Sequence, residues 1–175
     1  MINQTESFNP ATGESLGFSK LNTIEELIEI VNHARESQKL WQEYSVDERI
    51  RSILKIRDYL VNNADSIAEI ISRDNGKTRI DALATEVLPA AMGVSFYCKN
   101  VKRFLRDKKI RGGNIFLINK RSKIVRVPYG VVGIISPWNY PFSIPLAEVI
   151  MGLLAGNAVI LKTASETQMV GLALK

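Results

Sequence analysis

A polar turn between two apolar segments carries the residues best suited to chemistry. It runs from Ser136 to Phe142 and reads S-P-W-N-Y-P-F. Pro137 and Pro141 restrict the backbone on either side of Asn139. A side-chain amide held in this way can point at a developing oxyanion, a contribution typically worth a factor of about 10²–10³ in rate. Asparagine is also a preferred N-cap residue, so capping of the following helix is the alternative role for Asn139.

The elements around this turn form a predicted β-α-β unit. Residues 131–135 are a short apolar run without alternation, which is typical of a parallel strand buried on both faces. A helix is expected over about residues 143–155, and a second buried strand over residues 158–161. Such crossovers are almost always right-handed, so the two strands should be parallel neighbours. Ligands bind at the carboxyl ends of such strands, where Lys162 also falls, although Lys162 could simply be a solvated lysine.

Upstream of this unit the sequence is mainly helical. Thr23 and Ser45 are each followed three residues later by Glu, which predicts a capping box at the start of two helices. A third helix is expected over residues 64–73, ended by Asn-Gly. A fourth is expected over about residues 80–106, kinked or split by Pro89. The N-terminal helices therefore precede the parallel sheet.

From Gly112-Gly113 the pattern becomes extended. Residues 115–118 and 123–127 are β-rich runs separated by a polar N-K-R-S, which predicts a β-hairpin. By contrast, residues 8–17 are rich in Asn, Pro and Gly and are expected to form a turn or a short extended segment. An open parallel sheet usually has several strands, so we expect the sheet to be incomplete and the chain to continue beyond Lys175.

Composition limits the other function classes. The 175 residues are 46% apolar and carry a formal charge of +5 with basic and acidic residues interleaved. The densest basic stretch, residues 99–126, accompanies no nucleic-acid-binding motif, so we expect no nucleic-acid partner. No apolar stretch approaches the roughly 20 residues of a membrane span, and no secretory signal is visible. A single cysteine and the absence of a His/Cys cluster predict a cytoplasmic protein without a bound metal.

The sequence resembles the aldehyde dehydrogenase superfamily along essentially its whole length. The similar segments are V-P-Y-G-V-V-G-I-I-S-P-W-N-Y-P-F, then L-L-A-G-N-A-V-I-L-K, and upstream F-N-P-A-T-G-E, W-Q-E-Y-S-V-D-E-R-I and S-R-D-N-G-K-T followed by E-V. In that family a cysteine thiolate attacks the aldehyde, hydride passes to a nicotinamide, and water activated by a glutamate hydrolyses the thioester. The resemblance implies a nicotinamide cofactor, NADP or NAD, and an aldehyde substrate.

The resemblance also implies roles for individual residues. Asn139 would donate to the oxyanion of the thiohemiacetal, and Lys162 would bond the adenosine ribose hydroxyls, since a flexible ammonium can satisfy two oxygens. Many relatives read K-P-S-E after that lysine, whereas this chain reads K-T-A-S-E-T, which places Ser165 where the acid usually stands. A small hydroxyl favours NADP or dual specificity, and Glu166 keeps NAD open. The remaining residues expected to line the cofactor cleft are Ile135, Ser136, Pro137 and Trp138.

The resemblance predicts an α/β fold in three parts. These are an N-terminal helical part of the cofactor domain (1–110), a hairpin of the oligomerisation arm (111–128) and the start of a Rossmann-like NAD(P)-binding sheet (129–175). The intact protein would be a homodimer or homotetramer. Cys98 lies upstream of the cofactor strands and is interpreted as a small core residue, and His33 as a surface helix residue, so the chain alone should be inactive.

Two other interpretations remain open from sequence. One is a catalytically dead, truncated paralogue that binds a partner through its hairpin or through an open sheet edge. The other is a relative with acyl-CoA or acyl-phosphate chemistry on the same fold. The P-W-N turn resembles the hydrolytic branch most, so aldehyde oxidation to the carboxylic acid is the preferred interpretation.

Overall fold

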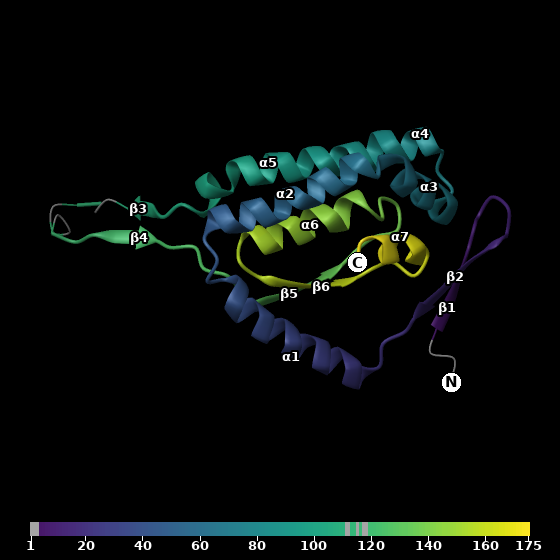
Figure 1. Cartoon of the computed structure of the whole chain (residues 1–175). Helices are drawn as coiled ribbons and strands as arrows, with labels where there is room; N and C mark the ends of the chain where they lie inside the picture. The colour runs from purple at the N-terminus through teal and green to yellow at the C-terminus, as the bar shows by residue number, and fades with distance from the viewer. Residues whose placement is uncertain (1–3, 111–112, 115, 117–118) are drawn as a thin grey trace.

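The computed structural model describes residues 4–110, 113–114, 116 and 119–175, which form helices and three small sheets (Figure 1). In chain order the elements are β1 (Gln4–Phe8), β2 (Ser15–Lys20), α1 (Ile24–Trp41), α2 (Val46–Asn62), α3 (Ala64–Asn75), α4 (Arg79–Ala82), the π-helix η1 (Leu83–Val87), α5 (Leu88–Leu105), β3 (Lys108–Ile110), β4 (Ser122–Ile124), β5 (Val131–Ile135), α6 (Ser143–Leu154), β6 (Ala158–Lys162) and α7 (Gln168–Ala173). The predicted α/β class is confirmed.

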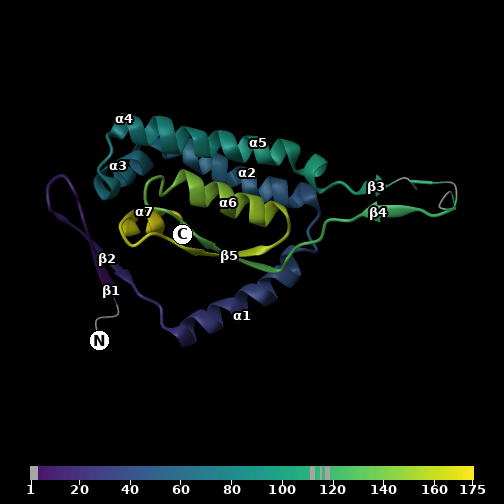
Figure 2. The same cartoon turned by 180° about the vertical axis from the view of Figure 1, so that it is seen from behind.

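The predicted β-α-β unit is confirmed. Strands β5 and β6 are parallel, with Val131 opposite Ala158 and Ile135 opposite Lys162. Both views place α6 and α1 on opposite faces of this pair (Figures 1 and 2). The expectation that both strands are buried on both faces is wrong for the described residues, because Ile135 is 83% exposed and only Ile134 of β5 is buried. A two-stranded sheet leaves each strand with one unpaired edge, and only one helix covers each face.

The main core lies between the helices rather than around the sheet. Helix α5 packs on α2 and α6, and α3 packs on α7. Both predicted capping boxes are present at the starts of α1 and α2. The hydroxyl and amide of Ser45 donate to Glu48, which lowers the pKa of that carboxyl. The largest fully buried apolar side chains include Phe142, Ile71, Ile150, Leu154, Val94 and Val170.

The long helix around Pro89 is split as predicted, and the split takes the form of a π-helical turn. The amide of Leu88 donates to the carbonyl of Leu83, five residues back instead of four. Pro89 then stands in the first turn of α5, where its missing N–H costs no helical hydrogen bond. A π-turn inserts one extra residue per turn and shifts which side chains face the core.

Two antiparallel hairpins are present. The turn expected within residues 8–17 joins strands β1 and β2, whose pairing extends beyond that segment to Gln4 and Lys20. In the second hairpin β4 pairs with β3, so Lys123 lies opposite Lys109. Among the described residues the partner of β4 is β3; the expected partner, residues 115–118, lies mostly outside the described part of the chain, which leaves out residues 115, 117 and 118. Strand pairing joins distant residues, so local β-propensity could not identify the partner.

Gly76 provides a test of how α3 ends. Its φ of +83° is left-handed, and a Cβ there would lie 2.7 Å from Cγ of Pro10. Gly76→Ala should therefore lower the free energy of unfolding by about 1–3 kcal/mol, from backbone strain and the contact with Pro10. Urea unfolding would measure the loss. Gly113→Ala is the control, because its Cβ would meet nothing within 4 Å, and an equal loss there would contradict the explanation.

Candidate functional site

The carboxyl ends of the two parallel strands bring several predicted site residues together. Ile135 and Lys162 are register partners, and the amide of Ser136 donates to the carbonyl of Lys162 at 3.0 Å. The Lys162 side chain is exposed and forms no ion pair with any residue that the structure describes. The Ser136 hydroxyl is buried and has no hydrogen-bond partner among the described residues. An unsatisfied hydroxyl and an exposed ammonium on residues joined by a backbone hydrogen bond are suited to a polar ligand.

The structure separates Asn139 from helix capping. Phe142 occupies the N-cap position of α6, and its side chain makes no capping hydrogen bond. Instead, the amides of Phe142 and Ser143 donate to Oε2 of Glu86 at 2.7 and 3.2 Å. The capping alternative for Asn139 is therefore wrong, because a buried glutamate from η1 satisfies the first amides of the helix. Asn139 is exposed, and within the described chain its side-chain amide has no hydrogen bond.

The backbone of the turn, in contrast, is held by side chains from the last residue of α3 and from the segment that follows it. The ammonium of Lys77 donates to the carbonyl of Asn139 at 3.0 Å and lies 4.6 Å from the ring centroid of Tyr140. The side-chain amide of Asn75 donates to the carbonyl of Trp138 at 2.9 Å. Two consecutive carbonyls of the turn are thus fixed, while the Asn139 side chain stays available.

Sequence reasoning missed Asn75, Lys77 and Glu86 as parts of the site. All three belong to the S-R-D-N-G-K-T…E-V segment whose likeness to the family was noted, so that likeness was the available signal. A second signal was Glu86 itself, a charged residue directly before Val87 in an apolar helical pattern. Their partners lie more than 50 positions along the chain, and nothing in local pattern joins them.

Asn157 fixes the opposite end of β5. Its side-chain oxygen accepts from the amides of Tyr129 and Gly130 at 2.7 and 3.2 Å, and its nitrogen donates to the carbonyl of Gly152 at 3.0 Å. The buried asparagine therefore joins the start of β5 to the end of α6. These hydrogen bonds hold the start of β5 against α6, and the turn that carries Asn139 follows directly from the other end of this strand.

The loop after β6 carries the residues expected to read the ribose. Ser165 and Glu166 are both exposed, and the Ser165 hydroxyl donates to Oε2 of Glu166 at 3.2 Å. The loop leads into α7, where the amide of Val170 donates to the buried carboxylate of Asp74 at 2.8 Å. Serine and glutamate are thus adjacent and free to meet a ligand from solvent.

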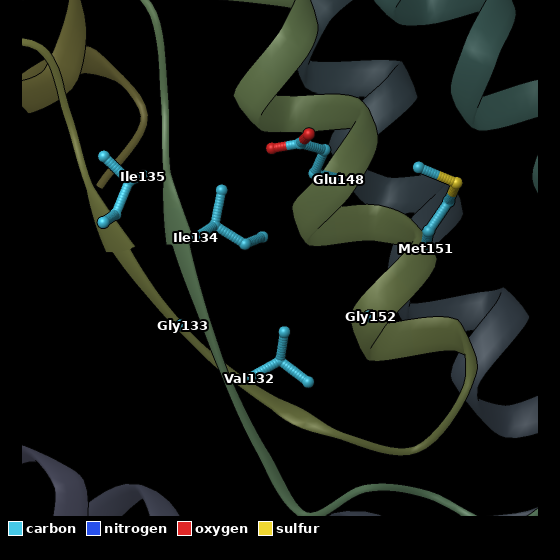
Figure 3. Close-up of a pocket in the computed structure, with 7 residues that line it drawn as sticks. All are labelled: Val132, Gly133, Ile134, Ile135, Glu148, Met151 and Gly152. Carbon is cyan, nitrogen blue, oxygen red and sulfur yellow. The ribbon is translucent and has the colours of Figure 1, made fainter.

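An open hollow lies between β5 and α6 (Figure 3). Ile135 is the one predicted site residue in its lining, and Glu148 supplies the one charged side chain. The hollow runs along β5 and α6 and includes neither Lys162 nor Asn139, so we do not assign the candidate site to it. Its lining comprises Val132, Gly133, Ile134, Ile135, Glu148, Met151 and Gly152.

Other titratable residues do not add to the site. Cys98 is buried in the helical core as expected, and burial raises the pKa of its thiol, partly offset by Arg57. A raised pKa disfavours the thiolate, so Cys98 is unsuited to act as a nucleophile. His33 is exposed on α1, as expected. Within the described residues we find no group of three or more His, Cys, Asp or Glu side chains placed to bind a metal.

None of the helices in the described part of the chain is long and apolar enough to cross a membrane.

The fold and the strand-end site define an α/β protein with a Rossmann-like parallel pair. The sequence pattern of the aldehyde dehydrogenase family matches residues 2–175. The chain therefore belongs to the aldehyde dehydrogenase family.

Individual proteins similar in sequence to this chain carry names of the same family. The chain is 35% identical to 4,4'-diapolycopene aldehyde oxidase of a Methylomonas species, over 88% of this chain and 29% of the relative. It is 33% identical to betaine aldehyde dehydrogenase of Vibrio vulnificus, over 97% of this chain and 34% of the relative. The chain thus spans about a third of the length of these relatives.

Solved structures are similar as well. Succinate-semialdehyde dehydrogenase from Burkholderia pseudomallei matches with a TM-score of 0.88 and 30% identity, over 98% of this chain and 34% of that chain. An NADP-dependent glyceraldehyde-3-phosphate dehydrogenase from Bacillus halodurans, in complex with NADP, matches with a TM-score of 0.88 and 26% identity, over 98% of this chain and 36% of that chain.

Proposed function

We propose that this chain supplies the oxyanion and ribose-binding part of an NAD(P)-dependent aldehyde dehydrogenase that oxidises an aldehyde to a carboxylic acid. One observation carries the proposal. The backbone of Asn139 is fixed at the carboxyl end of a parallel strand, while its side-chain amide has no partner within the described chain. A side-chain N–H donor on a fixed backbone, with no hydrogen-bond partner in the described part of the resting protein, suits an oxyanion that forms only during the reaction.

The strand-end residues fit a dinucleotide. Lys162 offers three donors from a flexible stem, and Ser136 presents a buried hydroxyl without a partner in the described part of the chain. Ile135, Pro137 and Trp138 add exposed apolar surface beside them. When bound, the nicotinamide group accepts the hydride. Ser165 adds a small hydroxyl that tolerates a 2′-phosphate, so NADP is preferred and NAD is accepted.

In the reaction Asn139 donates its amide N–H to the oxyanion formed when a cysteine thiolate attacks the aldehyde carbon. Cys98 cannot be that cysteine, since it is buried in the core between helices. Residues 1–175 therefore supply binding and oxyanion stabilisation, and the nucleophile and general base come from outside them. We expect the 175-residue chain alone to bind nucleotide without oxidising aldehyde.

Names of relatives support the chemistry. Betaine aldehyde dehydrogenase of Vibrio vulnificus and succinate-semialdehyde dehydrogenase of Burkholderia pseudomallei are named for aldehyde substrates, and the Bacillus halodurans enzyme was solved with NADP. We infer further that the intact protein is a cytoplasmic homodimer or homotetramer joined through the β3–β4 hairpin. That hairpin extends away from the helices in both views, and all its strand residues are exposed (Figures 1 and 2).

Nucleotide titration of the chain tests the cofactor assignment. We expect NADP⁺ and NAD⁺ to quench the fluorescence of Trp138, and Lys162→Met to weaken both affinities about tenfold by removing the ribose donor. Ser165→Glu should weaken NADP⁺ more than NAD⁺, because a carboxylate repels the 2′-phosphate.

Lys55→Met, at an exposed position on α2, is the matched control and should change neither affinity. An unchanged cofactor ratio in Ser165→Glu would remove Ser165 from the assignment. Loss of binding in Lys55→Met equal to that in Lys162→Met would contradict the strand-end site.

A further inference from the structure

Glu86 is a buried charge that the proposed reaction does not use. Its side chain is 0% exposed, and its partner Lys77 is 15% exposed, with Nζ 2.5 Å from Oε1. The other oxygen, Oε2, accepts the amides of Phe142 and Ser143. Burying such a pair is expensive, and a buried ion pair is weak evidence for a purely stabilising role.

The π-turn explains how a charged residue reaches this place. Glu86 lies within η1, where the hydrogen bond from Leu88 to Leu83 spans five residues. The added residue rotates the helix, so that Glu86 faces the start of α6 while its neighbours Val87 and Ala82 stay in the apolar core. Such turns often occur at functional sites, and here the turn brings a carboxylate to the segment that carries Asn139.

The pair touches this segment on both sides of Tyr140–Pro141. Lys77 bonds Glu86 and the carbonyl of Asn139 at once, while Glu86 holds the amide of Phe142. The peptide groups before and after Tyr140–Pro141 are therefore fixed to one ion pair. Loss of the Lys77 hydrogen bond would free the peptide group between Asn139 and Tyr140, which is attached to the same Cα as the Asn139 side chain.

We propose that Lys77 and Glu86 are positioning residues that set the direction of the Asn139 amide. This rests on the proposed function, since the direction matters for catalysis only if Asn139 is the oxyanion donor. The physical reason is that an oxyanion donor must lie within a few tenths of an ångström of its place, and a shift of about 1 Å can cost about 10²-fold in rate. Neither residue touches the substrate.

Lys77→Met tests this role with little loss of side-chain length. In the 175-residue chain, NMR order parameters of the Trp138–Tyr140 backbone amides should fall from about 0.85 to below about 0.6. Lys77→Arg, which keeps the charge, should restore most of the order. Arg79→Met removes the exposed ion pair with Asp65 and should leave the turn unchanged.

In the intact enzyme, Lys77→Met should lower kcat by about 10- to 100-fold while KM for the cofactor stays the same. Glu86→Gln should lower kcat in the same way. If the Glu86→Gln variant does not fold, the result for Lys77→Met alone decides whether the pair positions Asn139. Unchanged order of the turn in a folded Lys77→Met chain would overturn the inference. If the order parameters of the turn fall in Lys77→Met but Asn139→Ala leaves kcat unaffected, Lys77 does hold the turn, and it is the proposed oxyanion role of Asn139 that fails.

Discussion

Asn139→Ala should lower kcat of the intact aldehyde dehydrogenase by about 10²–10³. Within the described residues the side-chain amide of Asn139 makes no hydrogen bond, while its backbone carbonyl is fixed through Lys77. In the proposed role, removing it deletes a bond made only in the transition state, and it breaks no hydrogen bond among the described residues. We therefore expect unchanged cofactor affinity, measured by nucleotide titration, alongside the loss in steady-state rate.

The matched control is Asn32→Ala, an exposed asparagine on α1 that accepts from Arg35. It should leave kcat, KM and the melting temperature unaltered. If Asn139→Ala lowered cofactor affinity and rate by equal factors, uniform binding rather than oxyanion stabilisation would be its role. A large fall in melting temperature would point to a structural role.

Phe142→Ala should cost about 3–5 kcal/mol of unfolding free energy in the 175-residue chain. Phe142 is 2% exposed and lies in the core shared by α5 and α6. Truncation removes its buried ring and leaves a cavity directly beneath the site turn. Urea or guanidinium unfolding followed by circular dichroism would measure the change, and the midpoint should fall with the slope unchanged.

Tyr129→Ala is the control, since its side chain is 96% exposed and its described hydrogen bond is made by the backbone. It should change the unfolding free energy by less than about 0.5 kcal/mol. Equal effects of the two substitutions would mean that the packing around Phe142 contributes little. A loss in Phe142→Ala larger than about 5 kcal/mol would indicate that release of the Glu86 carboxylate adds to the cavity.

Local pattern determined much of the architecture. The side chains of Thr23 and Ser45 bond amides in their own first turns, so three-residue spacing identified both helix starts. The β-α-β unit followed equally well, because right-handed crossovers leave one arrangement for two apolar strands around a helix. Lys162 and Ile135 could be placed at one edge for the same reason. These features depend on residues close together in the sequence, or on the right-handed preference of β-α-β crossovers.

Tertiary structure decided whatever depends on distant partners. The sequence alone could not tell whether Asn139 caps α6, because the answer lies in Glu86, whose carboxylate reaches the amides from 56 residues away. Nor could it pair β4 with β3, since pairing is decided by which strands meet in space. Burial of the Lys77–Glu86 pair likewise exists only once α6 packs on the helices that precede it. Sequence thus determined the elements and the candidate donor, and packing decided what holds that donor in place.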